Sequence, residues 1–149
     1  MAGYFKADAP GRLQPPDGGW HDTGDIVTID REGFVTIRGR AKRFAKIGGE
    51  MVSLPAVESC AAALWPASDH AVVTRPDPRK GEQLVLFTTN KEANAAALQA
   101  WGKANGVTEL AIPRDLRTLE ALPVLGTGKT DYVTLTAMAA EPGKARSAA

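Results

Sequence analysis

The sequence has little cysteine, little histidine and almost no net charge. These features argue against a disulfide-bonded protein, a metal-cluster protein and a protein that binds nucleic acid or membranes through its overall charge. It holds 149 residues with one cysteine and two histidines. We therefore expect no intramolecular disulfide and no metal cluster, since His21 and His70 have no partners at ligand spacing. Lysine and arginine number 18 against 17 aspartates and glutamates, a formal net charge of +1. This balance gives no bulk electrostatic attraction to nucleic acid or to a membrane surface.

Long apolar runs and internal repeats are also missing. No stretch approaches the roughly 20 apolar residues that cross a bilayer. The opening segment MAGYFKADAPGR lacks the apolar stretch of a signal peptide. With 44% apolar and 23% charged residues, the chain has an ordinary globular composition. One domain with a short appendage is the expectation for this length.

The most informative part of the sequence runs from Trp20 to Glu58, after a loop rich in proline and glycine. Apolar β-formers flank Asp30-Arg31-Glu32-Gly33, which predicts a hairpin over 25–40. The run RGRAKR at 38–43 then carries four cations in six residues. A second, shorter hairpin with a Gly48-Gly49 turn is expected over 44–52. Because an isolated hairpin is marginal in water, the strands of the first hairpin are expected to need a partner sheet.

Beyond this stretch, caps and apolar periodicity predict helices and strands. Helices are expected from the Ser53 cap to Pro66, from the Asn94 cap to Gly106, and over 131–139. Strands are expected over 70–74, 83–89 and 115–120, with a polar loop at 76–82. The predicted fold class is α+β, with β-hairpins followed by a small three-stranded sheet flanked by helices.

Lys129, in the segment GTGKT at 126–130, has two interpretations. The segment fails the Walker pattern of a phosphate-binding loop, because Pro123 stands where that pattern requires glycine. A lysine between small, flexible residues can still enter a site as a point charge on a carboxylate or phosphate. Exposed lysines are common, so the spacing alone favours an ordinary surface lysine.

Three other candidates have structural explanations that the pattern favours. The RGRAKR run is expected to be a solvated cationic turn, since it lacks the interleaved aromatics of a nucleic-acid platform. Asp22 and Asp25 are paired carboxylates, but capping and turn duty is more frequent for Asp beside Thr and Gly than acid–base chemistry. Cys60 lies on the apolar stripe of the first helix and is expected to be buried and inert.

Four motifs together carry a resemblance to a known family. They are TGD at 23–25, GR at 39–40, KIGGEMVSLPAVE at 46–58 and LPVLGTGKTDY at 122–132. In order and spacing they resemble the C-terminal region of the adenylate-forming superfamily, which includes acyl-CoA synthetases, luciferases and peptide-synthetase adenylation domains. The nearest resemblance is to acyl-ACP synthetases joined to a 2-acylglycerophosphoethanolamine acyltransferase, and it extends from Met1 to about Ala139.

The resemblance implies a division of the chain. Residues 1–41 would be the tail of a missing N-terminal adenylation domain, 42–43 a hinge, 44–140 the mobile C-terminal α+β domain, and 141–149 a disordered tail. Residues 1–41 are then expected to be loosely packed or paired with another copy of the chain. The ordered core is expected to begin near Phe44.

The resemblance also implies a two-step reaction. Fatty acid and ATP, with Mg²⁺, form an acyl-adenylate, and a phosphopantetheine thiol on acyl carrier protein then displaces AMP. The fragment alone is expected to be inactive. Two alternatives stay open: the acceptor could be coenzyme A, or the chain could be a carrier-docking module without catalysis of its own. The implied location is cytoplasmic, with the whole protein at the cytoplasmic face of a bacterial inner membrane.

Individual residues receive roles from the same resemblance. Asp25 would hold the ribose hydroxyls of the nucleotide, and Arg40 would contact its ribose or phosphate. Lys42, where many members have Asp, would be the hinge. Lys129 would be the catalytic residue of the first step, which replaces the surface-lysine interpretation. The Gly48-Gly49 turn would take its place in the thioester step, since the absence of side chains lets a pantetheine arm pass.

A set of cations is a candidate docking surface for the acidic carrier protein. Its members are expected to be Arg43, Lys46, Arg75, Arg79 and Lys80.

Overall fold

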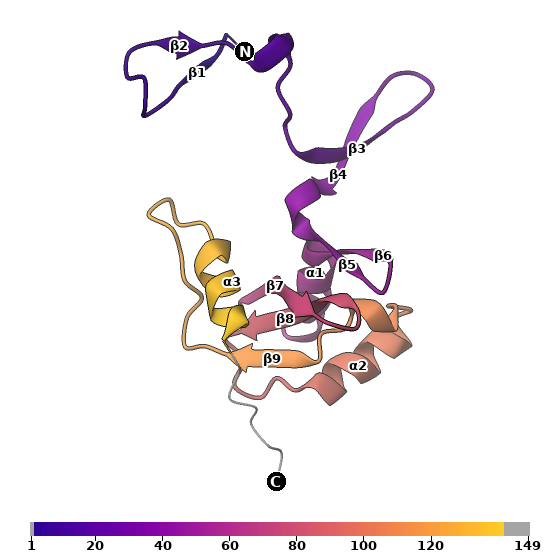
Figure 1. Cartoon of the computed structure of the whole chain (residues 1–149). Coiled ribbons are helices and arrows are strands. Elements are labelled where there is room, and N and C mark those ends of the chain that lie inside the picture. The colour runs from indigo at the N-terminus through magenta and orange to yellow at the C-terminus, as the bar shows by residue number, and fades with distance from the viewer. Residues whose placement is uncertain (1, 142–149) are drawn as a thin grey trace. The chain divides into compact units, whose positions relative to one another are not determined.

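A computed structural model describes residues 2–141 (Figure 1), so the predicted tail lies, apart from Glu141, outside the described residues. The chain divides into two compact units, residues 1–42 and 43–149. Within the described residues, no helix is long and apolar enough to cross a membrane.

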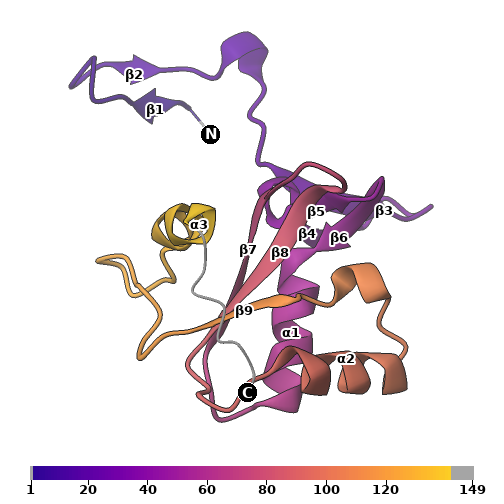
Figure 2. The same cartoon turned by 60° about the horizontal axis from the view of Figure 1, so that its bottom comes forward.

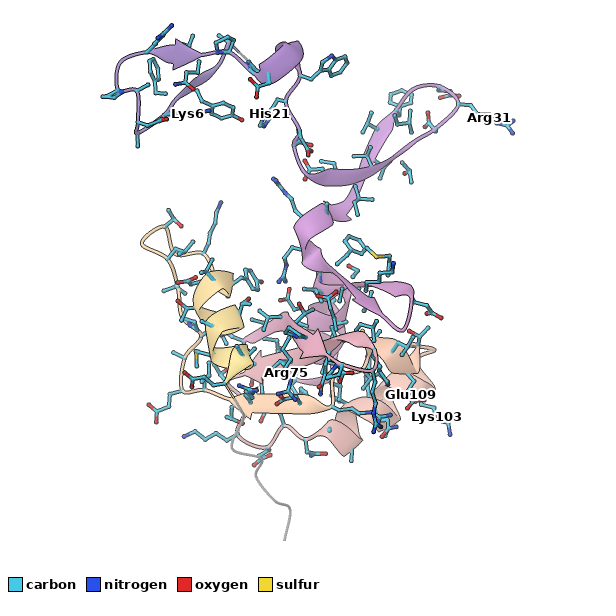
Figure 3. The ribbon with its side chains drawn as sticks, in the orientation of Figure 1. Lys6, His21, Arg31, Arg75, Lys103 and Glu109 are labelled. Carbon is cyan, nitrogen blue, oxygen red and sulfur yellow. The ribbon has the colours of Figure 1, made fainter. Side chains whose placement is uncertain are left out.

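The first unit consists of two small antiparallel pairs of strands. β1 (Tyr4–Phe5) pairs with β2 (Leu13–Gln14), and β3 (Asp25–Ile29) pairs with β4 (Val35–Arg40), with the short helix η1 (Asp17–Gly19) between the pairs. The β3–β4 hairpin confirms the prediction for 25–40, and Arg31 lies at its tip (Figure 3). Asp30 closes the turn by accepting hydrogen bonds from the amides of Glu32 and Phe34, both at 2.9 Å. This is the local side-chain chemistry that aspartate supplies in turns.

The first unit has no buried side chain among those that the structure describes. Large apolar side chains instead stand exposed on β3–β4 and its approach; they include Trp20, Ile29, Phe34, Val35 and Ile37. A hairpin of this size buries too little apolar surface to be stable alone. These strands therefore need a covering partner.

The second unit is built on a five-stranded sheet. Its strands are β5 (Phe44–Ile47), β6 (Glu50–Ser53), β7 (His70–Asp77), β8 (Gly81–Thr88) and β9 (Asp115–Thr118). β7 and β9 flank β8, antiparallel and parallel respectively. The second predicted hairpin, β5–β6, joins the end of β8 through the register pair Ile47 and Gly81. The three expected strands are present, and the hairpin extends their sheet.

One element boundary differs from the prediction. The segment 76–82, expected as a polar loop, is mostly strand, because β7 runs to Asp77 and β8 starts at Gly81. The Asp77 carboxylate accepts hydrogen bonds from the amides of Arg79 and Lys80 at 2.8 and 2.9 Å. These bonds close the connection within three residues, so polar composition here marks a tight turn rather than a loop.

Helices cover both faces of this sheet (Figure 2). α1 (Leu54–Leu64) and α2 (Ala95–Ala104) lie on one face, and α3 (Tyr132–Ala140) lies on the other. As predicted, Ser53 and Asn94 cap the first two helices by accepting from the amides of Ala56 and Ala97. Such caps satisfy amides that have no partner within the helix.

Alternation along the central strands creates the two cores. Val72, Leu84 and Leu86 face α1 and α2. Their neighbours Ala71, Val73, Val85 and Phe87 face α3, where they meet Leu135 and Ala139. Successive strand residues point to opposite faces, so one near-continuous apolar run serves both layers. The α+β class is confirmed.

Cys60 departs from the expectation of a buried thiol. It is only half-buried, whereas Val57 and Ala61 carry the buried stripe of α1. Partial burial nevertheless raises the pKa of the Cys60 thiol above its ordinary value. A raised pKa keeps the group in its unreactive protonated form, which agrees with the expected inertness.

Candidate active site

Lys129 lies in a closed hairpin rather than in a flexible loop. Val124 and Thr130 form an antiparallel bridge across it. The Leu125 amide donates to the Lys129 carbonyl and the Gly128 amide to the Leu125 carbonyl, both at 2.8 Å. We call residues 123–131 the lysine hairpin. Its backbone bonds hold Lys129 in one place on an exposed projection.

The base of the lysine hairpin is tied to α3. The Asp131 amide donates to the Pro123 carbonyl at 2.8 Å, which closes the hairpin. The Asp131 carboxylate caps α3 by accepting from the amides of Val133 and Thr134 and from the Thr134 hydroxyl. Hydrogen bonds from Thr134 are the main cause of the lowered pKa of Asp131. The lysine is therefore mounted directly on a helix start.

Three apolar residues close to Lys129 in the sequence are exposed, as the lysine is. Val124 is 63% exposed, Leu125 47% and Val133 81%. Lys129 itself is exposed and makes no ion pair with any residue that the structure describes. An exposed ammonium without an ion-pair partner among the described residues is available to an anionic ligand.

Asp25 and Arg40 meet in the first unit. They are register partners on β3 and β4, with Asp25 Oδ1 at 2.8 Å from Arg40 Nε. Arg40 also donates through Nη1 to the Thr23 carbonyl at 3.0 Å. The Arg40 side chain is 67% exposed, whereas that of Asp25 is 17% exposed. Asp22 accepts from the Gly24 amide, so it performs the turn duty that the sequence predicted for both aspartates.

The Gly48-Gly49 turn is bare and anchored. Both residues have positive φ, 59° and 91°, and a Cβ on either would meet nothing within 4 Å. The Gly48 amide donates to the Lys80 carbonyl at 2.9 Å, which fixes the turn to the connection between β7 and β8. The β5–β6 turn and the lysine hairpin lie apart in both Figures 1 and 2. The second unit thus presents these two loops at different places.

Lys42 lies in the short helix η2 (Ala41–Arg43), at the boundary between the two units. Its side chain lies outside the described residues. No contact in the structure tests its expected role as a hinge.

The cationic candidates separate into engaged and free groups. Arg43 is not a solvated cation, because it pairs with Glu58 at 2.6 Å and donates to the Val72 carbonyl at 2.9 Å. Arg75, on β7, donates to the Gln83 side chain and pairs with Asp115 of β9 at 3.5 Å. Both arginines thus have acidic partners within the second unit.

The remaining docking candidates are exposed. Lys46, Arg79 and Lys80 make no ion pair within the described part of the chain. The Lys46 amide donates to the Glu82 carboxylate at 2.6 Å, so the strand that carries Lys46 lies beside the turn that carries the other two. The cationic patch is smaller than the sequence suggested.

Two residues of interest were not singled out by sequence reasoning. Glu58 and Tyr132 lie with Arg43 in one half-buried cluster, where the Tyr132 hydroxyl donates to the Glu58 carboxylate at 3.2 Å. Each ends one of the motifs that carried the family resemblance, at 46–58 and 122–132. Their places at the ends of these motifs are the sequence signal that could have singled them out.

Three layers, with a bare glycine turn and a lysine hairpin at different places, make the second unit a small α+β domain, as the resemblance to the C-terminal region of adenylate-forming enzymes implied. Comparison with known protein families identifies one family for this chain. The chain belongs to the AMP-binding enzyme C-terminal domain family, which matches residues 51–129, more than half of its 149 residues.

Curated relatives and solved structures agree with that family. The 2,3-dihydroxybenzoate-AMP ligase of Bacillus subtilis is 32% identical over 137 residues, 91% of this chain and 25% of that protein. The medium-chain-fatty-acid–CoA ligase of Ectopseudomonas oleovorans is 36% identical, over 85% of this chain and 23% of that protein. ATP-bound MatB from Rhodopseudomonas palustris has the same fold, with a TM-score of 0.70 at 24% identity over 85% of this chain and 26% of that one.

This chain spans about a quarter of the length of these relatives. Their names are those of acid–AMP and acid–CoA ligases. The superfamily assignment is therefore confirmed, whereas the closer resemblance to acyl-ACP synthetases stays a prediction.

Proposed function

We propose that this chain is the C-terminal catalytic domain of an ATP-dependent, AMP-forming acid–thiol ligase that activates a fatty acid. Residues 1–41 are the end of a larger adenylation domain, Lys42 and Arg43 are the hinge, and 44–140 are the moving domain. The observation that carries the proposal is the exposed Lys129 in a hairpin closed by backbone hydrogen bonds. Acyl carrier protein is the proposed acceptor, as in acyl-ACP synthetases, and the enzyme acts in the cytoplasm.

Lys129 acts in the first step. An oxygen of the acid's carboxylate bonds to the α-phosphorus of ATP, and pyrophosphate leaves with the electron pair of the broken bond. Negative charge shifts between the reacting oxygens, and a fixed ammonium beside them stabilises that charge. The exposed apolar residues Val124, Leu125 and Val133, close to Lys129 in the sequence, support this role, because a surface that covered them would exclude water from this end of the domain.

Asp25 and Arg40 hold the nucleotide. A carboxylate can accept hydrogen bonds from both ribose hydroxyls, and a guanidinium can donate to a phosphate or ribose oxygen. Both groups are already ordered by their mutual contact at 2.8 Å. Because the Arg40 side chain is largely exposed, its exchange from Asp25 to a nucleotide has a small desolvation cost.

The Gly48-Gly49 turn acts in the second step. The sulfur of a phosphopantetheine thiol bonds to the acyl carbon, AMP leaves with the electrons of the broken bond, and the thiol proton goes to solvent. A turn without side chains leaves a path for the pantetheine arm. Rotation about Lys42 would present this turn after the lysine hairpin, which agrees with the separate positions of the two loops (Figure 1).

The exposed apolar face of β3–β4 supports the assignment of residues 1–41 to a larger domain. The side chains of Ile29, Phe34 and Ile37 are each at least 65% exposed. A partner surface that covers them would supply the apolar burial that this hairpin lacks.

A second candidate function is docking of the acidic carrier protein, either alone or before the thioester step. The observation in its favour is the free cationic set of Lys46, Arg79 and Lys80 beside the glycine turn. Opposite charge would steer such a partner most strongly at low salt. Titration with holo carrier protein, followed by NMR at low salt, tests this candidate. Unmoved amides over 79–82 would exclude it.

A chimera tests the main proposal. Residues 20–141 of this chain replace the corresponding region of the medium-chain-fatty-acid–CoA ligase, and ATP–pyrophosphate exchange is measured with a medium-chain fatty acid. We expect exchange in the chimera, with a loss of about 10²–10³-fold in Lys129→Ala. Lys103→Ala, which changes an exposed lysine on α2 (Figure 3), is the matched control and should leave the rate unchanged. Equal rates in both variants would refute the role of Lys129.

The acceptor is tested in the same chimera. Coenzyme A and holo acyl carrier protein are compared as thiols at equal concentration, with and without charge reversal of Arg79 and Lys80. The proposal expects charge reversal to weaken use of the carrier protein and to spare coenzyme A. If coenzyme A alone is used, the chain is an acyl-CoA ligase domain.

A further inference from the structure

One carboxylate oxygen in the second unit receives three hydrogen bonds. Glu58 Oε1 accepts from Arg43 Nη2 at 2.6 Å, from the Val72 amide at 2.8 Å and from the Tyr132 hydroxyl at 3.2 Å. The Arg43 guanidinium also lies over the Tyr132 ring, 3.8 Å from its centre, and donates to the Val72 carbonyl. We call Arg43, Glu58 and Tyr132 the Glu58 cluster.

The surroundings of the Glu58 cluster make its bonds strong. The side chains of Arg43 and Glu58 are 17% and 18% exposed, so little water screens the pair. Charge-assisted bonds of this length are stronger than neutral ones, and a guanidinium over a ring adds a cation–π attraction. Burial, and then the charge of Glu58, raises the pKa of Tyr132. Its hydroxyl therefore stays a donor to Glu58 across the ordinary pH range.

The three residues of the Glu58 cluster come from three separate parts of the chain. Arg43 is the first residue of the second unit and directly follows Lys42. Tyr132 is the first residue of α3 and follows the lysine hairpin, whose last residue, Asp131, closes it. Glu58 lies on α1. One carboxylate thus joins Arg43, the residue after the proposed pivot, to Tyr132, the first residue after the lysine hairpin.

We propose that Glu58 is a positioning residue that locks the lysine hairpin to the hinge, with Arg43 and Tyr132 as its two arms. The inference rests on the proposed function. A lysine delivered by rotation about Lys42 reaches the reacting atoms only if pivot and lysine move as one rigid body. Slack between them displaces the ammonium, and a displacement of about 1 Å can cost about 10²-fold in rate.

The other end of α3 offers a matched control. Arg117 donates to the carbonyls of Met138 and Ala139 at 2.6 and 3.2 Å and pairs with Asp115 at 3.1 Å. Its side chain is 14% exposed, close to the burial of Arg43. Arg117 therefore holds α3 by similar bonds but far along the helix from Lys129. The variant Arg117→Met therefore shows how weaker attachment of α3 at its far end affects the lysine hairpin.

The first measurement uses the chain as it is. Amide hydrogen exchange is followed at Leu125, Gly128 and Asp131, whose amides are bonded within the lysine hairpin. We expect Tyr132→Phe, which keeps the ring and removes only the hydroxyl, to speed exchange there several-fold relative to the amides of β7 and β8. Glu58→Gln should speed exchange there more strongly. Arg117→Met should leave unchanged the ratio of the exchange rate in the lysine hairpin to that in β7 and β8. Equal ratios in Tyr132→Phe and Arg117→Met would overturn the proposal.

The second measurement uses the chimera and separates positioning from folding. In Tyr132→Phe, kcat for pyrophosphate exchange should fall about tenfold while KM for ATP and fatty acid stays within about twofold. The thioester step, started from supplied acyl-adenylate, should be unchanged, because Lys129 is not used there. Equal loss in both steps would show a merely structural role and sink the inference.

The two hypotheses fail separately. If Lys129→Ala leaves pyrophosphate exchange intact, the proposed function fails, and the amide-exchange result still decides whether the cluster holds the hairpin. If Lys129→Ala is inactive while Tyr132→Phe equals the unaltered chimera in both measurements, the proposed function stands and the positioning role of the cluster is wrong.

Discussion

The Asp25 carboxylate forms an ion pair with the Arg40 guanidinium, with Oδ1 and Nε 2.8 Å apart, between register partners on adjacent strands. Sequence reasoning gave each residue a separate contact with the nucleotide. The structure shows that each is also the other's partner. A nucleotide would therefore meet an ordered pair, in which Asp25 is shielded and Arg40 is exposed.

This pairing gives the first prediction, for Arg40→Met. Exposed ion pairs contribute about 0–1 kcal/mol, so the free energy of unfolding should change by less than about 1 kcal/mol. In the chimera, KM for ATP should rise while pyrophosphate exchange at saturating ATP is reduced less. Denaturant unfolding and steady-state kinetics measure the two effects. A large loss of stability with unchanged KM would reverse the interpretation of Arg40.

The second prediction concerns Gly49→Ala. Its φ of 91° is unfavourable for any residue with a Cβ, although no atom lies within 4 Å of that position. Left-handed backbone costs about 1–2 kcal/mol, so the loss of stability should have this size and come from the backbone alone. In the chimera, thioester formation should fall and pyrophosphate exchange should not.

Gly106→Ala is the control for this second prediction. Gly106 has a φ of 72°, and its Cβ position is also free of neighbours within 4 Å. The backbone cost should therefore be similar, with both half-reactions intact. A matching loss of thioester formation in both variants would show that stability, and not the bare turn, limits that step.

The third prediction is a pH dependence from Tyr132. Its pKa in the folded chain is raised above the ordinary 10.0. Between these two values the unfolded chain has lost the proton and the folded chain keeps it, so stability falls as pH rises. Urea unfolding of the original chain and of Tyr132→Phe at pH 8 to 11 (about the range of tyrosine titration) isolates this slope. The difference in stability between the two should shrink with rising pH, and a constant difference would contradict the prediction.

The fourth prediction concerns Cys60. Partial burial raises the pKa of its thiol, so alkylation at neutral pH should be slower than that of an unfolded cysteine. Rising pH should accelerate alkylation, since the thiolate is the reactive form. Mass spectrometry after timed treatment with iodoacetamide measures the rate, and the chain in urea is the reference. Equal rates with and without urea would show that the fold does not protect Cys60.

Local elements were predictable because their causes are local. The Asp30 turn, the Ser53 and Asn94 caps and the glycine turn each depend on residues within a few positions of one another. Side-chain oxygens of Asp, Ser and Asn satisfy nearby amides, and glycine accepts positive φ. The strand ends at the β7–β8 connection were missed because pairing between the two strands, and not local composition, extends β7 to Asp77 and starts β8 at Gly81.

The candidate site was less predictable from residue chemistry. Spacing alone favoured a surface lysine at Lys129, and only the resemblance of whole motifs indicated catalysis. The backbone bonds that close the lysine hairpin could not be inferred from a run of glycine and threonine. Arg43 was expected in water and lies instead against Glu58 and Tyr132. The roles of Asp25, Arg40, Lys42, Gly48, Gly49 and Lys129 stay predictions.

By itself, the sequence determined the family, the fold class and the order of the elements, because these follow from motifs, caps and periodicity along the chain. Tertiary structure alone decided which charges are free and which are bound. The fold brings α1, the end of η2 and the start of α3 to one place, and only there does Glu58 contact Arg43 and Tyr132. Pairing of charges depends on distance in space and on exclusion of water, and neither is written in the spacing of residues.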